Sequence, residues 1–117
     1  MAPPAKTREV FDVLKECAEC MYTESYGEIA NRVGLAPSGI GYQLGWVRDS
    51  ICRRHGLPWI NLLAVNKEEW FPGESFLPEG FAGTESDNRT LWRGMVLHVF
   101  AYDWRNLQFD ALAAGAD

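Results

Sequence analysis

The chain has 117 residues, 47% of them hydrophobic and 23% charged, which is the size and composition of one globular domain. No apolar run approaches the ~18 residues that cross a bilayer and the N-terminus lacks a signal-peptide pattern, so we expect one cytoplasmic domain over residues 1–117 that does not enter a membrane. The net charge of −5 opposes non-specific attraction to nucleic acid, and three cysteines, an odd number, fit a reducing compartment better than a disulfide framework.

The first predicted helix spans about residues 8–22. Residues 1–6 precede it and contain two prolines, so we expect a flexible lead-in. Thr7 is predicted to cap the helix, because a threonine oxygen can accept from the free backbone N–H groups of the first turn. The residues of its apolar stripe recur at three- and four-residue spacing: Val10, Val13, Leu14, Cys17, Ala18 and Met21.

The next two predicted helices are joined by a tight turn, as in a helix-turn-helix unit. Ser25 and Glu28 have the spacing of a capping box at the start of a helix that runs to about Val33. Gly34 is suited to the left-handed conformation just after its end. A third helix is predicted from Ser38 to the residue before Gly56.

A helical wheel separates two sides of the 38–55 helix. The apolar side holds Ile40, Leu44, Val47 and Ile51, and the opposite side holds Tyr42, Trp46, Asp49 and Arg53. Large aromatic residues and an arginine on the solvent side suit an interface better than a solubilising surface.

The remaining elements are two strands and a fourth helix. Residues 59–65 are apolar and predicted as a buried strand, and residues 74–77 as a second strand. The expected fold class is therefore α+β: four helices with a helix-turn-helix and a small two-stranded antiparallel sheet, which is winged-helix-like. The last helix, 88–102, is capped by Ser86 or Asp87 and is apolar over more than half its circumference. It is either central to the core or covered by a second copy in a homodimer, and residues 110–117 are expected to fray.

The positive charge is concentrated in one part of the chain. Between Ile29 and Lys67 five bases face one acid, Asp49, a net charge of +4 that leaves −9 for the rest of the chain. This basic stretch coincides with the 38–55 helix, as the electrostatic footprint of a DNA-binding unit should. A charged face that only keeps the domain dissolved produces the same count.

Signals for metal binding and catalysis are weak. Cys17-x-x-Cys20 and Cys52-x-x-His55 supply four residues of the types that bind zinc, although small buried thiols explain the cysteines more simply. His98 falls on the apolar side of the last helix, which favours a core position. No phosphate-binding loop, dinucleotide fingerprint or H-E-x-x-H motif occurs. We expect neither an enzyme nor a cofactor.

Residues 23–73 contain S-Y-G-E-I-A, a V-G turn, a glycine-rich helix, a Pro-Trp step and a V-N-K turn closing on P-G. This series resembles the DNA-binding domain of O6-alkylguanine alkyltransferases and of the alkyltransferase-like proteins. The resemblance implies that Tyr26 lies at the DNA backbone and that the next helix meets DNA through Ser38, Gly39, Tyr42 and Gln43. Trp59 stands where the reactive cysteine of the family would fall, so alkyl transfer is not implied. The chain also resembles small proteins of phages and prophage islands.

Two functions are predicted. The first is a non-enzymatic, winged-helix-like DNA-binding or regulatory protein that contacts duplex DNA through the 38–55 helix. The alternative is a protein-binding module, such as a phage-encoded inhibitor of a host defence system. The residues predicted to bind DNA or a protein partner are Tyr26, Ser38, Gly39, Tyr42, Gln43, Trp46, Arg48, Arg53, Arg54 and Lys67.

Overall fold

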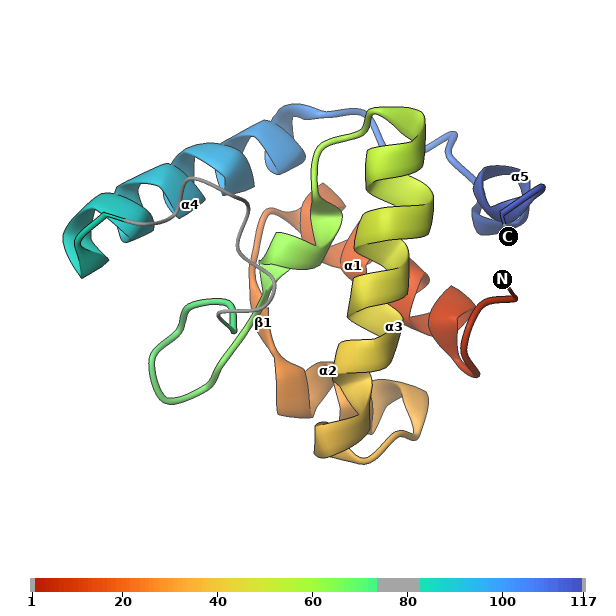
Figure 1. Cartoon of the computed structure of the whole chain (residues 1–117), viewed down its shortest axis with the longest axis horizontal. Helices are drawn as coiled ribbons and strands as arrows, with labels where there is room; N and C mark the ends of the chain where they lie inside the picture. Colours follow the sequence, from red (N-terminus) through yellow and green to blue (C-terminus); the bar gives the residue numbers. More distant parts are fainter. Residues whose placement is uncertain (1, 74–82, 117) are drawn as a thin grey trace.

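The computed structural model describes residues 2–73 and 83–116, which form five α-helices and one two-stranded parallel sheet (Figure 1). The elements follow the chain in this order: α1 (Thr7–Cys20), β1 (Glu24–Ser25), α2 (Tyr26–Val33), η1 (Pro37–Gly39), α3 (Ile40–Trp46), η2 (Val47–Arg53), η3 (Ile60–Leu63), β2 (Ala64–Val65), α4 (Glu85–Ala101) and α5 (Phe109–Ala113). Elements η1 and η3 are 3₁₀ turns, and η2 is a π-helical segment.

Helix α1 supplies the central stripe of the core. The predicted apolar residues are buried with the exception of Met21, which is 68% exposed because the chain turns there in a left-handed conformation, φ 57°. Thr7 does not cap the helix as predicted. It is the first helical residue, Lys6 occupies the cap position, and the Thr7 hydroxyl donates to the Pro4 carbonyl at 2.6 Å.

The predicted order of two helices and a tight turn is present in α2 and α3. Ser25 Oγ accepts a hydrogen bond from the Glu28 N–H at 3.2 Å, which is half of the predicted capping box. The Ser25 N–H instead donates to the Glu24 carboxylate at 3.1 Å. Gly34 ends α2 with φ 78°, a conformation that costs glycine little.

Residues 37–55 form one continuous helical rod, of which the middle part is π-helical (Figure 1). Its predicted apolar residues, Ile40, Leu44, Val47 and Ile51, are all buried. A π turn has an i→i+5 hydrogen bond and is wider than an α turn. Within this π-helical segment, the neighbouring residues Ile51 and Cys52 are both buried.

The predicted antiparallel sheet, and with it the winged-helix-like fold, is wrong. Residues 60–65 are buried as expected, but most of them form η3, and only β2 is extended. β2 pairs with β1, with Glu24 opposite Ala64, and the pair is parallel because the helical segment between the strands returns the chain in the same direction. The predicted strand 74–77 lies outside the described residues. The fold is α-rich.

Helix α4 lies at the periphery of the molecule (Figure 1). Thr84, rather than Ser86 or Asp87, caps it by accepting from the Asp87 N–H at 3.1 Å. Only Trp92, Val96 and Val99 are buried, so the helix is not central to the core. Within the part of the chain that the structure describes, no helix is long and apolar enough to cross a lipid bilayer.

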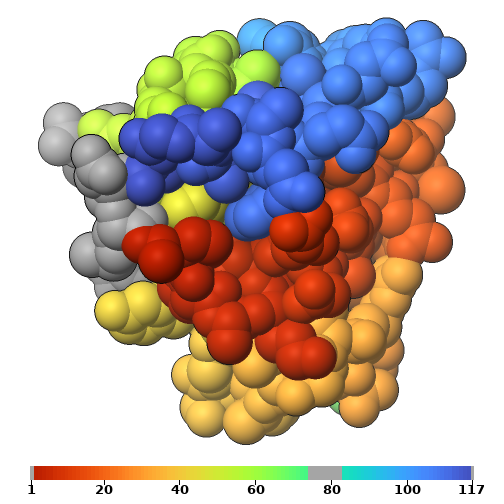
Figure 2. All heavy atoms as spheres, turned by 90° about the vertical axis from the view of Figure 1, so that its right-hand side faces the viewer, coloured from red at the N-terminus to blue at the C-terminus, as the bar shows by residue number. Residues whose placement is uncertain are grey.

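The C-terminal segment, which we expected to fray, contains α5 and packs against the rest of the domain. Phe109 and Leu112 are buried, and Phe109 lies against the rings of Phe11 and Trp46, with centroids 5.8 and 5.9 Å away. Figure 2 shows this segment, in dark blue, lying next to the N-terminal residues, in red. An ion pair between Arg8 and Asp110 at 2.6 Å joins the two ends of the chain.

Candidate functional site

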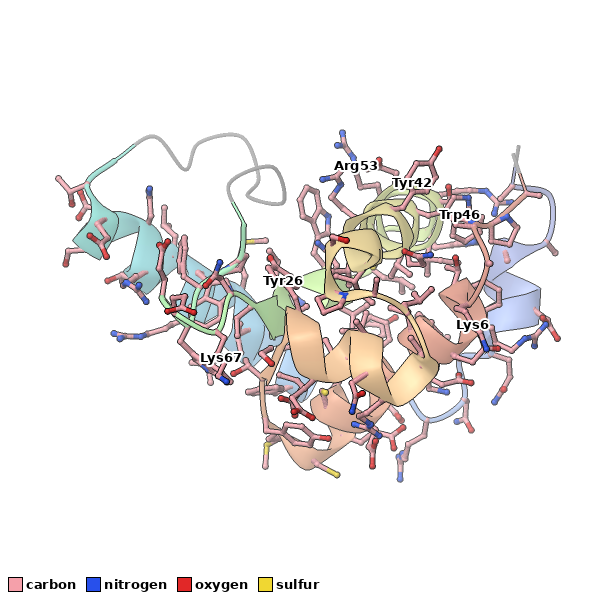
Figure 3. All side chains as sticks on the ribbon, turned by 90° about the horizontal axis from the view of Figure 1, so that it is seen from below. Lys6, Tyr26, Tyr42, Trp46, Arg53 and Lys67 are labelled. Carbon is pink, nitrogen blue, oxygen red and sulfur yellow. The ribbon has the colours of Figure 1, made fainter. Side chains whose placement is uncertain are left out.

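The turn before α3 is exposed and contains no charged residue of its own. Ser38 and Gly39 are exposed there, and Tyr42 is 70% exposed and points outward (Figure 3). No charged residue occurs between Arg32 and Arg48 in the sequence. Three of the predicted contact residues are thus accessible together, but without a cation among them.

Two predicted contact residues are buried. Gln43 is 6% exposed, and its amide donates to the Ala5 carbonyl at 2.9 Å. Trp46, also 6% exposed, is covered by Phe109 of α5. The helical wheel placed Trp46 on the solvent side because it took no account of a segment far along the chain. The prediction that Trp46 lies on the solvent side is wrong, and in this structure neither side chain is accessible to a partner.

Two of the four predicted phosphate-binding cations, Arg48 and Arg54, have close hydrogen-bond partners within the chain. Arg48 binds both carboxylate oxygens of Asp49, at 2.8 and 2.9 Å, and this pairing holds the pKa of Asp49 below its usual range. Arg54 donates to the carbonyls of Leu112 and Ala114 at 3.0 and 2.6 Å. Lys67 is exposed on a turn far from Tyr42 (Figure 3). The basic stretch of the sequence therefore does not fold into a basic patch.

Tyr26 connects the start of α2 to the turn after β2. Its hydroxyl oxygen accepts a hydrogen bond from the Gly73 N–H at 2.5 Å. Burial raises the pKa of Tyr26, so the phenol stays neutral well above physiological pH. This contact gives Tyr26 a structural role within the chain.

Arg53 differs from the other arginines of the rod. Its side chain is 61% exposed, and its guanidinium lies over the Trp59 ring, 5.6 Å from the centroid. An Asp49 carboxylate oxygen lies 3.9 Å from its guanidinium, the closest acidic contact among the described residues. Since Arg48 occupies that carboxylate at shorter range, the three side chains together keep a charge of about +1.

Next to Trp59 lies an apolar groove that the sequence analysis did not foresee. We call it the α4 groove. It has a volume of about 310 Å³ and lies between the chain that leaves the rod and α4. The described residues that line it are Gly56, Leu57, Pro58, Trp59, Met95, His98 and Tyr102.

One stripe of α4 faces this groove. Met95, His98 and Tyr102 follow one another at three- and four-residue spacing, and Leu91 continues the stripe one turn earlier. Leu91 is 49% and Tyr102 37% exposed, and His98 is exposed rather than in the core as predicted. The i, i+4, i+7, i+11 spacing was visible in the sequence. The surface that this stripe faces was not visible in the sequence, because Trp59 was predicted to lie in a strand and not in the turn at residues 56–59.

The residues considered for zinc are not brought together. Cys17 and Cys52 are buried and Cys20 is exposed, while His55 Nε2 lies 2.7 Å from the Leu112 carbonyl. Among residues 2–73 and 83–116, no three histidine, cysteine or acidic side chains are close enough to hold a metal ion.

Comparisons of the chain with protein-family models, curated proteins and solved structures found no match. The resemblance to the alkyltransferase-like domain thus remains a prediction that depends on the motifs in residues 23–73. Any function must be argued from the surface itself.

Proposed function

We propose that this chain is a protein-binding module and that the α4 groove is its contact site. The observation that carries the proposal is an apolar groove of about 310 Å³ whose described walls hold Trp59, Met95 and Tyr102. Aromatic residues and methionine are enriched at the centres of protein interfaces, where they supply large contact areas. A groove of about 310 Å³ lies at the lower end of the range for ligand pockets, and it is large enough to hold a bulky side chain of a protein partner.

The charge distribution favours a protein over DNA. DNA affinity comes largely from Lys and Arg side chains that neutralise phosphates. The net charge is −5, and Arg48 and Arg54 are committed to partners within the chain. Tyr42, Ser38 and Gly39 are exposed but uncharged, so Arg53 and Lys67 are the exposed cations among the predicted DNA contacts whose side chains have no close hydrogen-bond partner in the described part of the chain.

The test is a selection of peptides from a random library displayed on yeast, against three forms of the full chain. These are the wild type, His98→Glu in the groove, and Leu97→Glu on the neighbouring, 65% exposed position of the same helix. Both variants place the same charge near the C-terminal end of α4, so their effects on helix stability match. Thermal unfolding of each variant confirms that it is folded.

Peptides that bind the wild type and Leu97→Glu equally, and His98→Glu at least about tenfold more weakly, would support the proposal. A failure to enrich any peptide, or equal binding to His98→Glu, would reject it. Titration of the protein with a labelled DNA duplex at two salt concentrations tests the alternative, DNA-binding function. Salt-dependent binding that is lost in Tyr42→Ala but kept in His98→Glu would favour a DNA-binding function instead.

A further inference from the structure

A positive charge lies beside the α4 groove, on a residue that contacts Trp59 but does not itself line the groove. Arg53 is fixed above Trp59 by a cation–π contact of 5.6 Å, and its side chain is 61% exposed. A stacked guanidinium keeps its N–H edge free to bind a carboxylate through two parallel hydrogen bonds. Because stacking also restricts the side chain, less rotational freedom is lost on binding.

Among the described residues, the carboxylate that pairs with Arg53 is that of Asp49, and Arg48 binds it more closely. Asp49 accepts hydrogen bonds from Arg48 through both of its oxygens, at 2.8 and 2.9 Å, against 3.9 Å for the nearest contact with Arg53. The same hydrogen bonds from Arg48 lower the pKa of Asp49, which keeps that carboxylate ionised and paired. A second carboxylate, brought by a partner, would find in Arg53 a preoriented donor.

The facing wall adds no acid. Met95 and His98 come from α4 and Tyr102 is its C-cap, and none of the described residues that line the groove is Asp or Glu. His98 is exposed on this wall. The described lining of the groove thus carries no acid and has a positive charge next to it at Trp59, although the chain as a whole carries −5. Such a local inversion of charge favours an acidic partner.

We infer that the α4 groove binds a linear segment of a partner protein that presents one aromatic side chain next to an acidic residue. The aromatic ring packs against Trp59 and Met95, and the neighbouring carboxylate binds Arg53. This inference rests on the proposed function and specifies the chemistry of the partner. A volume of about 310 Å³ is at the lower end of the range for ligand pockets, in keeping with one bulky side chain as the anchor.

Three synthetic, fluorescein-labelled heptapeptides test this inference with the full-length chain. The first contains one tryptophan preceded by two glutamates. The second has glutamines in place of the glutamates, and the third has alanine in place of the tryptophan. Fluorescence anisotropy measures their affinity for the wild type, Arg53→Gln, Arg53→Lys and the control Arg93→Gln, an exposed arginine elsewhere on α4.

We expect the first peptide to bind the wild type and Arg93→Gln alike. Arg53→Gln should weaken it about three- to fivefold and remove most of its salt dependence, without changing the affinity of the glutamine peptide. Arg53→Lys should recover part of the loss, since it keeps the charge but not the planar fork. The alanine peptide should bind at least about tenfold more weakly than the first.

Two results would overturn the inference. One is equal affinity of the glutamate and glutamine peptides for the wild type, and the other is an Arg53→Gln variant that binds the glutamate peptide like the wild type. If the library selection still enriches neutral peptides that His98→Glu rejects, the protein-binding function stands and only the acidic specificity is wrong. If no peptide binds in either experiment, both proposals are wrong.

Discussion

Replacement of Trp46 by alanine tests whether this residue belongs to the core or lies on the surface as a partner contact. Trp46 is 6% exposed and packs against Phe109 of α5. Truncation of a buried Phe or Trp to alanine lowers the free energy of unfolding by about 3–5 kcal/mol. We expect the lower end, about 3 kcal/mol, because the indole N–H has no hydrogen-bond partner among the described residues.

The size of the expected thermal shift follows from the length of the chain. An unfolding entropy of about 2.1 cal/mol/K for each of the 117 residues is about 0.25 kcal/mol/K in total. A loss of about 3 kcal/mol therefore lowers Tm by about 12 °C. Trp46→Phe keeps a ring against Phe109 and removes the unpaired N–H, so it should change stability by no more than about 1 kcal/mol.

Far-UV circular dichroism, followed through urea and thermal unfolding, measures both variants without relying on tryptophan fluorescence. The pair Trp46→Ala and Phe109→Ala forms a double-mutant cycle with an expected coupling of about 0.5–1.5 kcal/mol. A Trp46→Ala protein whose Tm stays within about 4 °C of the wild type would refute burial under α5. Equal losses in Trp46→Phe and Trp46→Ala would refute the argument from the unpaired N–H.

Three further predictions concern the C-terminal segment and the thiols. Arg54→Ala removes both hydrogen bonds to the carbonyls of the C-terminal segment. We therefore expect amide hydrogen exchange over residues 109–116 to accelerate about fivefold, while exchange in α1 stays at the wild-type rate. Wild-type exchange rates over residues 109–116 would contradict the contact. At pH 8 the native protein should react with a thiol reagent at Cys20 alone, because burial raises the pKa of Cys17 to about 11 and of Cys52 to about 12. Thiols in the unfolded chain ionise near pH 8.5, whereas the buried thiols stay protonated, so the free energy of unfolding should fall between pH 9 and 11. Urea titrations that find a constant free energy of unfolding over this range would contradict the prediction.

Local structure was predictable wherever neighbouring residues decide it. The apolar stripe of α1 and the burial of Ile40, Leu44, Val47 and Ile51 follow from three- and four-residue spacing. The Ser25 cap and the left-handed Gly34 follow from the chemistry of helix ends. Each of these features depends on residues within a few positions of one another.

The sheet shows where that reasoning fails. A short buried apolar run such as 59–65 does not distinguish a strand from a helical turn, because both bury every side chain. Its first half became η3 and its end paired with Glu24–Ser25, a partner on the far side of two helices. The choice of partner, and so the parallel direction, is a property of the whole chain.

The candidate site divides in the same way. Sequence alone identified the helical rod, its outward Tyr42 and Arg53, and the apolar residues of the last helix, because these depend on periodicity. Tertiary structure alone decided that α5 covers Trp46, that Arg48 and Arg54 are already paired, and that α4 lies beside Trp59 to form a groove. The reason is physical: whether a side chain on a helix surface meets water or protein depends on contacts between segments that are distant in sequence, and no local pattern encodes those contacts.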